Sequence, residues 1–401
     1  MAVLISSQFT VHSLKVMKKL SLLSLSLLLL CCKSNASQPA LETNDTIPAE
    51  PVEQEYKLSL LFVGDLMQHG VQYKAALNAG GGKTYDYEEC FRYVKDEISA
   101  ADVAIGNFET TTAGGAPSTY PNFNAPDAYM FACRDAGFDI LLTANNHSCD
   151  KASKGITRTI EMCDSLGLPH IGTYVDQNER DLEYPYVLEK NGIRVGLLCY
   201  TYGTNGIPVP KPHIVNQIDR DQMAKDIQKL KTLHVDVIIA AVHWGVEHAL
   251  LPNQGQRDLA DWLFAQGVDH IIGGHPHVVE PVEVREDSAS GAKHLLAYSL
   301  GNYVSNMSKP NNEGGMMVKL ELSKNSRTNI TRLDSAGYCL TWVSRPSVSG
   351  HKNYRIYPVS VPQTMLNAKE KVLFDKTLKT ERALFEKHNK NIQEYQVEWT
   401  N

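Results

Sequence analysis

The chain has 401 residues, of which 43 % are hydrophobic and 21 % are charged. This balance excludes a disordered or collagen-like protein and supplies enough apolar side chains for a large core. Lys and Arg total 39 against 45 Asp and Glu, a formal net charge of −6. Because no long basic run stands out, this charge argues against a nucleic-acid partner and against a polyanion held by bulk charge alone.

The N-terminus has the pattern of an export signal. A basic start at Met17 precedes an apolar run over residues 20–32, which ends in two cysteines and is too short to span a bilayer comfortably. Translation starts at Met1 or at Met17, and both alternatives stay open. Residues 1–32 resemble a bacterial lipoprotein signal with the lipid on Cys32, and an ordinary cleaved signal is the alternative. We expect the mature protein to be exported, either periplasmic or anchored to a membrane through a lipid.

The rest of the chain is predicted to be a linker followed by one domain. Residues 33–56 are rich in Ser, Pro, Thr and acidic side chains and lack apolar periodicity, which predicts a flexible linker. The folded domain is expected over residues 57–340, and residues 341–401 add strands and a helix that complete it. Short apolar runs alternate with helix-like stretches, which is typical of an α/β fold whose sheets are covered on both faces.

The predicted elements follow in chain order. The predicted strands span residues 58–65, 103–109, 138–147, 170–174, 194–202, 235–245, 268–277, 294–302, 316–322 and 354–361. The predicted helices span residues 87–100, 127–136, 153–166, 219–232, 254–266 and 369–395. Six cysteines follow the signal without CxxC spacing, so they are predicted to be neither zinc ligands nor catalytic. An exported protein can form disulfides, and buried free thiols are the alternative.

Polar side chains follow one predicted strand after another at its carboxyl end. The clusters are Gly64-Asp65, Gly106 to Glu109, Asn145-Asn146-His147, His243 to Glu247, Gly273 to His277 and Gly301-Asn302. Because ligands bind beyond the carboxyl ends of strands in open α/β sheets, we expect these clusters to meet at one site. Imidazole and oxygen ligands together suit Zn, Mn or Fe, and enough are present for two ions bridged by a carboxylate. Taken alone, an Asp after a strand is more typical of a helix cap, an Asn pair of a turn, and a His of the surface or of a satisfied core position. The joint pattern therefore carries the prediction of a dinuclear metal site.

The same motifs resemble those of a known family. FVGDLM, GNFET, TANNH, VHWGVEH, GGHPHVVEPVE and YSLGNYV stand in the order found in the poly-gamma-glutamate capsule biosynthesis proteins, the CapA-like family, and the resemblance covers residues 57–340. That family is similar to the calcineurin-like metallophosphoesterases. The resemblance implies a four-layer αββα sandwich around two divalent ions (Mn, Zn or Fe) and a role in making, exporting or anchoring an anionic polymer.

The resemblance also implies a role for each matched residue. The implied metal ligands are Asp65 on the first metal, Glu109 as the bridge, Asn146, His243 and His275 on the second metal, and His277 on the first. His147 would be the catalytic histidine, which stabilises an oxyanion or protonates the leaving group. Glu247 and Asn302 are candidates for substrate binding.

One position departs from the phosphoesterase pattern. Phosphoesterases open with Asp-x-His, whereas Met67 occupies the third position here, so the first metal is expected to be weakly held or absent. Asp150 and Glu280 adjoin the motifs and are predicted to be solvated or to support the ligands.

Two functions stay open. The first is a metal-dependent hydrolase that acts on a phosphoester or an amide-like bond, with metal-activated water as the nucleophile. The second is a non-catalytic cell-envelope assembly factor that binds an anionic polymer through a metal cleft, with capsule-synthesis membrane proteins as candidate partners. The sequence lacks a GxxxxGK[ST] phosphate loop, a dinucleotide GxGxxG motif and a GxSxG serine elbow, which argues against a ligase, a dehydrogenase and a serine hydrolase.

Overall fold

The computed structural model describes residues 53–398. The predicted export signal and nearly all of the predicted linker lie outside these residues, so both stay predictions. Within residues 53–398, no helix is long and apolar enough to cross a membrane.

A nine-stranded sheet carries the first strand-end residues. Its strand β1 (Glu55–Leu66) lies between β2 (Val103–Phe108), which runs parallel to it, and β14 (Gly314–Asn325), which runs antiparallel. The other strands of this sheet are β3 (Ile140–Leu142), β4 (His170–Ile171), β13 (Asn302–Val304), β15 (Thr331–Ser344), β16 (Arg355–Pro358) and β17 (Gln393–Glu394). Because β1, β2 and β3 are parallel neighbours, their carboxyl ends lie along one edge of the sheet.

A six-stranded sheet carries the remaining strand-end residues. Its parallel strands are β7 (Ile193–Thr201), β9 (Val237–His243), β10 (His270–Gly274) and β12 (Lys293–Ala297). Antiparallel strands β6 (Tyr186–Lys190) and β11 (Val282–Glu286) close its two edges, and β5 (Thr173–Tyr174) pairs with β8 (Ile214–Val215) separately. Every residue of β9 is buried, as expected for a strand with both faces covered.

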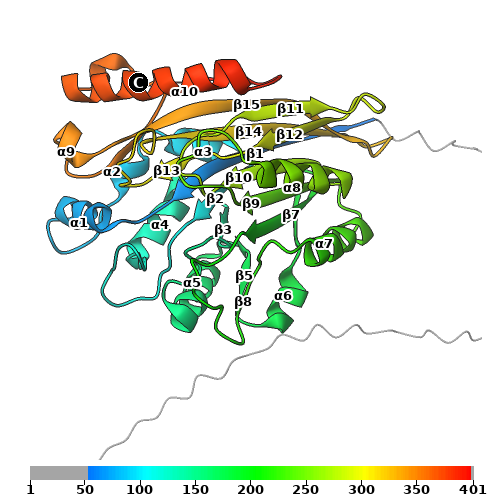
Figure 1. Cartoon of the computed structure of the whole chain (residues 1–401), viewed down its shortest axis with the longest axis horizontal. Coiled ribbons are helices and arrows are strands. Elements are labelled where there is room, and N and C mark those ends of the chain that lie inside the picture. Colours follow the sequence, from blue (N-terminus) through cyan, green and yellow to red (C-terminus); the bar gives the residue numbers. More distant parts are fainter. Residues whose placement is uncertain (1–52, 399–401) are drawn as a thin grey trace, which may run out of the picture. The chain divides into compact units, whose positions relative to one another are not determined.

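Helices cover the outer faces of the two sheets, which pack against each other through β1, β7 and β10. The helices are α1 (Gly70–Ala79), α2 (Glu88–Phe91), α3 (Lys95–Ala100), α4 (Asp127–Ala136), α5 (Ala152–Leu166), α6 (Gln177–Glu183), α7 (Arg220–Thr232), α8 (Gln254–Ala265), α9 (Pro346–Ser349) and α10 (Ala368–His388). Phe374 of α10 packs against Trp342 of β15, and Leu230 of α7 lies against Gly196 of β7. Figure 1 shows α10 running along β15, with α7 and α8 beside β7 and β9. The predicted four-layer αββα sandwich is confirmed.

The C-terminal helix is shorter than predicted. α10 begins after Asn367, whose side chain accepts hydrogen bonds from the first helical N–H groups, and it ends at His388. The prediction of a helix over residues 369–395 is therefore wrong at its C-terminal end. Asn391 adopts a φ of 54°, which a right-handed helix does not allow, and β17 then pairs with β15.

Several further elements were not predicted, and the structure decides the state of the cysteines. Strand β15 was not predicted from the sequence, and neither was α1, whose buried residues are Gln72, Ala75 and Ala76 and give little apolar periodicity.

All cysteines within the described residues are buried free thiols, which is the second of the two predicted alternatives.

Candidate metal centre

The two sheets bring the carboxyl ends of their parallel strands together. Asp65 lies at the end of β1, and His243 ends β9. Glu109 follows β2, and the segments after β3, β9 and β10 supply the other predicted residues. We call the following eight residues the strand-end cluster: Asp65, Glu109, Asn146, His147, His243, Glu247, His275 and His277.

The first half of the strand-end cluster is built around His277. Its Nδ1 lies 3.0 Å from Asp65 Oδ2 and 3.1 Å from Asn302 Oδ1, and its Nε2 lies 3.6 Å from Glu109 Oε1. Asp65 Oδ1 accepts a 2.7 Å hydrogen bond from Asn107 Nδ2. The imidazole is therefore fixed between two buried carboxylates.

The second half of the strand-end cluster is built around His243. Its Nε2 lies 2.8 Å from Asn146 Oδ1 and 3.5 Å from Glu109 Oε1, and its Nδ1 lies 3.3 Å from Asn107 Nδ2. The His275 ring centroid is 4.9 Å from that of His243. Glu109 consequently faces both halves, which is the position that a bridging ligand requires.

Unpartnered polar atoms test whether this arrangement fits a metal. Both oxygens of Glu109 and Nδ1 of His275 are buried and have no hydrogen-bond partner within the described residues. A buried carboxylate without a partner is costly, and a cation would satisfy it. These residues fit a divalent ion.

Two groups of side chains within the described residues have ligand atoms close enough to hold one ion each. The first group is Asp65, Glu109 and His243, and the second is Glu247, His275 and His277. The resemblance instead implies that His277 shares a metal with Asp65 and Glu109 and that His243 serves the other. Glu109 lies close to both His243 and His277, so the geometry is compatible with either histidine binding the same ion as Asp65 and Glu109.

The backbone of the cluster is strained. His275 has a φ of 97° and His277 a φ of 57°, both in the left-handed region that favours glycine. Such conformations persist only where the surroundings impose them, and they concentrate at functional sites. A glycine suits position 274 for a different reason, because a Cβ there would lie 3.1 Å from Asp65 Oδ1 and would push this carboxylate from its place.

Burial and the neighbouring charges set the ionisation of the cluster. Burial lowers the pKa of His243 to about 3 and that of His275 to about 2, so both rings are neutral and suited to bind metal. Burial by itself would lower the pKa of His277, but Glu109 and Asp65 raise it to about 9. Burial likewise opposes ionisation of Asp65, yet its hydrogen bond to His277 lowers its pKa to about 2. Burial and the charge of Asp65 raise the pKa of Glu109 well above its usual range.

The predicted catalytic residue, His147, is held by an acid. Its Nδ1 lies 2.7 Å from Asp150 Oδ2, which also accepts a 2.6 Å hydrogen bond from the backbone N–H of Phe123. The Phe123 ring packs edge-on against the imidazole, with centroids 4.6 Å apart. Asp150 is thus buried and supports His147, as one of the two predicted alternatives states.

The sequence matches the family described as "Bacterial capsule synthesis protein PGA_cap" over residues 59–307. The chain belongs to this family. It is similar to the capsule biosynthesis protein CapA of Bacillus anthracis, with 28 % identity over 294 residues that cover 71 % of this chain and 68 % of that protein. It is also similar to the PGA biosynthesis protein CapA of Bacillus subtilis (strain 168), with 28 % identity over 292 residues, or 69 % of this chain and 71 % of that protein. Among solved structures, it is similar to the calcineurin-like phosphoesterase YfkN from Bacillus subtilis, with a TM-score of 0.39 and 14 % identity over 82 % of this chain and 98 % of that one.

Two predicted substrate residues of this capsule synthesis protein differ in accessibility. The Glu247 side chain is 49 % exposed, so it can meet a ligand that approaches His275 and His277. Asn302 is fully buried, and its amide nitrogen donates to the backbone oxygens of His277 and Asn312. The structure therefore places Asn302 as a support for His277.

Sequence reasoning missed three residues of the site. Asn107 bonds Asp65 and approaches His243, although it was noted only as part of a motif. Tyr202, which is 46 % exposed, has its ring centroid 4.5 Å from that of His275. Asn205 accepts hydrogen bonds from both Tyr202 and Asn146. Tyr202 follows the end of β7, so the strand-end pattern could have found it.

Proposed function

We propose that this protein is an exported metal-dependent hydrolase that acts on a phosphoester or amide-like bond in the synthesis, export or anchoring of poly-gamma-glutamate. The observation that carries the proposal is the buried carboxylate of Glu109, whose two oxygens lack a hydrogen-bond partner within the described residues and whose Oε1 lies 3.5 Å from His243 Nε2 and 3.6 Å from His277 Nε2. Membership in the capsule synthesis family supports an anionic polymer as the substrate class. A lipid on Cys32 would tether the enzyme near the membrane proteins that make or export the polymer.

Different residues would bind the metal, transfer the proton and contact the substrate in the proposed reaction. The carboxylates and imidazoles of the strand-end cluster would hold one or two divalent ions, with Glu109 between them. A bound cation would polarise the scissile group and lower the pKa of an attacking water. Asp150 holds Nδ1 of His147, which leaves Nε2 as the atom that can pass a proton to the leaving group. Tyr202 and Glu247 line the exposed approach to His275.

The test is turnover by the purified protein after loading with Mn, Zn or Fe. The panel is a phosphodiester, a phosphomonoester and poly-gamma-glutamate, each measured before chelation, after chelation and after the metal is restored. We expect turnover on at least one substrate, loss on chelation, and loss in Glu109→Gln. His234→Asn removes an exposed histidine that precedes β9, at the end of this strand opposite His243, and it should keep the wild-type rate. If the protein binds metal but turns over none of the three substrates, the proposal is contradicted.

A second function is supported by the same family membership. The two CapA relatives are described by biosynthesis and not by hydrolysis. A non-catalytic assembly factor would use a bound cation to hold an anionic chain, because cations supply the local positive charge that a net −6 protein lacks overall. Metal-dependent binding of poly-gamma-glutamate without turnover supports this version, whereas an affinity that chelation leaves unchanged contradicts it.

A further inference from the structure

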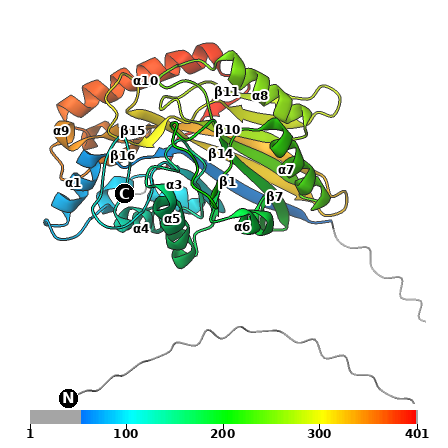
Figure 2. The same cartoon turned by 60° about the horizontal axis from the view of Figure 1, so that its bottom comes forward.

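A basic pocket lies between α8, β11 and the C-terminal end of α10. Its cavity has a volume of about 290 Å³. The charged and titratable side chains that line it are Arg257, Glu283, Arg285, Lys387, His388 and Lys390. Four of them are Lys or Arg and one is a carboxylate, in a chain with a net charge of −6. Figure 2 shows the C-terminal end of α10 next to α8. These two helices carry Lys387 and Arg257.

Two of these cations lack an ion-pair partner. Arg285 pairs with Glu283 at 2.7 Å and with Asp261 at 2.6 Å, and Lys390 pairs with Glu283 at 3.3 Å. Arg257 and Lys387 are exposed and form no ion pair within the described residues. The pocket therefore keeps positive charge after its internal pairs are counted, which is the condition for attracting an anionic ligand.

Short segments connect the basic pocket to the strand-end cluster. Leu251, four residues after Glu247, lines the pocket, and so does Pro281, four residues after His277. Because an extended chain rises by at most about 3.6 Å per residue, four residues span at most about 14 Å. A few units of an extended polymer are enough to contact both places.

The chemistry of the lining favours a polymer of carboxylates. Arg and Lys bind carboxylates through charge-assisted hydrogen bonds, and the Arg fork matches the two oxygens of the group. Leu251, which is 46 % exposed, adds apolar surface for the methylene segments between charges. We propose that the basic pocket is a binding subsite for an extended polycarboxylate chain whose neighbouring segment reaches the strand-end cluster. The identity of this chain as poly-gamma-glutamate rests on the proposed function.

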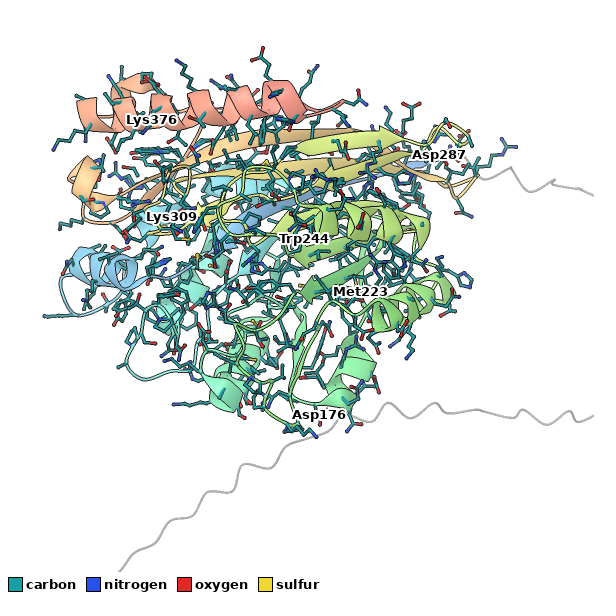
Figure 3. The ribbon with its side chains drawn as sticks, viewed as in Figure 1. Asp176, Met223, Trp244, Asp287, Lys309 and Lys376 are labelled. Carbon is teal, nitrogen blue, oxygen red and sulfur yellow. The ribbon has the colours of Figure 1, made fainter. Side chains whose placement is uncertain are left out.

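The test measures binding of a fluorescent poly-gamma-glutamate oligomer by anisotropy, in chelator, so that neither metal nor turnover contributes. We expect Arg257→Gln/Lys387→Gln to bind at least tenfold more weakly than wild type at low salt, with the difference shrinking as salt screens the charges. The matched control is Lys376→Gln/Lys379→Gln, which removes two exposed cations from the same helix. Lys376 lies toward the opposite end of α10 (Figure 3), about 16 Å from Lys387 at 1.5 Å per residue. The control should bind within twofold of wild type.

The outcomes separate the pocket from the hydrolase. Equal affinity of wild type and Arg257→Gln/Lys387→Gln overturns the subsite, and so does an equal loss in the control, because bulk charge would then explain binding. The absence of binding by wild type also overturns it. If wild type turns over none of the substrates, the hydrolase proposal is contradicted, but the binding measured by anisotropy still tests the basic pocket. Thermal unfolding of both double variants verifies that each is folded.

Discussion

Two fully buried glutamates, Glu109 and Glu381, occupy different regions and show why burial alone does not make a site. Neither has a hydrogen-bond partner for either oxygen within the described residues. Burial raises the pKa of both carboxyls well above the usual range. Glu109 faces Nε2 of two histidines, whereas Glu381 extends from α10 against Gly314, whose missing side chain leaves room for it.

The neighbours of the two carboxyls decide what each can do. The charges of Glu313 and Glu394 add to burial around Glu381, so a proton is what satisfies it. Around Glu109, the imidazoles of His243 and His277 and the carboxylate of Asp65 offer further ligand atoms, so a divalent ion can replace the proton. Among the described residues, Glu109 belongs to a group able to hold a metal and Glu381 does not. A buried carboxylate indicates a metal site when its neighbours are ligands as well.

Replacing each glutamate by glutamine tests most directly whether Glu109 binds metal and Glu381 does not. We expect Glu109→Gln to lower metal affinity by more than about 100-fold, because losses of even the outer supporting partners cost roughly 10- to 100-fold. Glu381→Gln should bind as much metal as wild type. Elemental analysis of the dialysed proteins measures both. Equal metal content in wild type and Glu109→Gln, or an equal loss in both variants, would contradict the distinction.

A second substitution separates chemistry from metal binding inside the strand-end cluster. His147→Gln should lower kcat by roughly 10²- to 10⁴-fold, the usual contribution of a general acid, while the metal content stays at the wild-type value. Asp150→Asn should lower kcat less and change its pH profile, because the asparagine no longer holds Nδ1–H of His147 as a carboxylate does. Steady-state kinetics with parallel metal analysis measure these effects. A fall in metal content in His147→Gln would instead place His147 among the ligands.

The strand-end residues were predictable because the carboxyl end of a buried strand is marked in the sequence, where an apolar run gives way to polar residues. Asp65, His243 and His275 follow apolar runs, and parallel pairing brings such ends together. The helix over residues 127–136 was predicted with its observed bounds, since Gly137 ends it with a φ of 105°. Periodicity and turn residues carry this information locally.

The supporting contacts were not predictable because they depend on distances between segments. The hydrogen bond from Phe123 to Asp150 joins segments 27 positions apart, and Asn107 of β2 meets His243 at the end of β9. The basic pocket is built from Arg257 and Lys387, which lie 130 positions apart and belong to no motif. Strand order and helix packing decide which of these groups meet.

A third buried carboxyl, that of Glu280, extends the comparison. It has one hydrogen bond, and it belongs to neither of the groups of described residues that could hold a metal ion. Gln256 Nε2 donates to its Oε2 at 2.7 Å, while Oε1 has no partner within the described residues. Burial raises the pKa of Glu280 from 4.5 to about 8. The folded state therefore binds more protons than the unfolded state between these values, and the free energy of unfolding must fall as the pH rises through this window.

The expected size of this pH effect is large for one side chain. The full shift corresponds to roughly 5 kcal/mol lost between pH 4.5 and pH 8, at about 1.36 kcal/mol per pKa unit. Glu280→Gln keeps an oxygen that can accept from Gln256 and cannot ionise, so its advantage over wild type should grow steadily from pH 5 to pH 8. Denaturant unfolding of the chelated proteins across this range measures the difference, with the exposed Glu386→Gln as the control that should run parallel to wild type. Parallel curves for Glu280→Gln and wild type would mean that water or a cation already satisfies this carboxylate, and the contrast with Glu109 would then lose its basis.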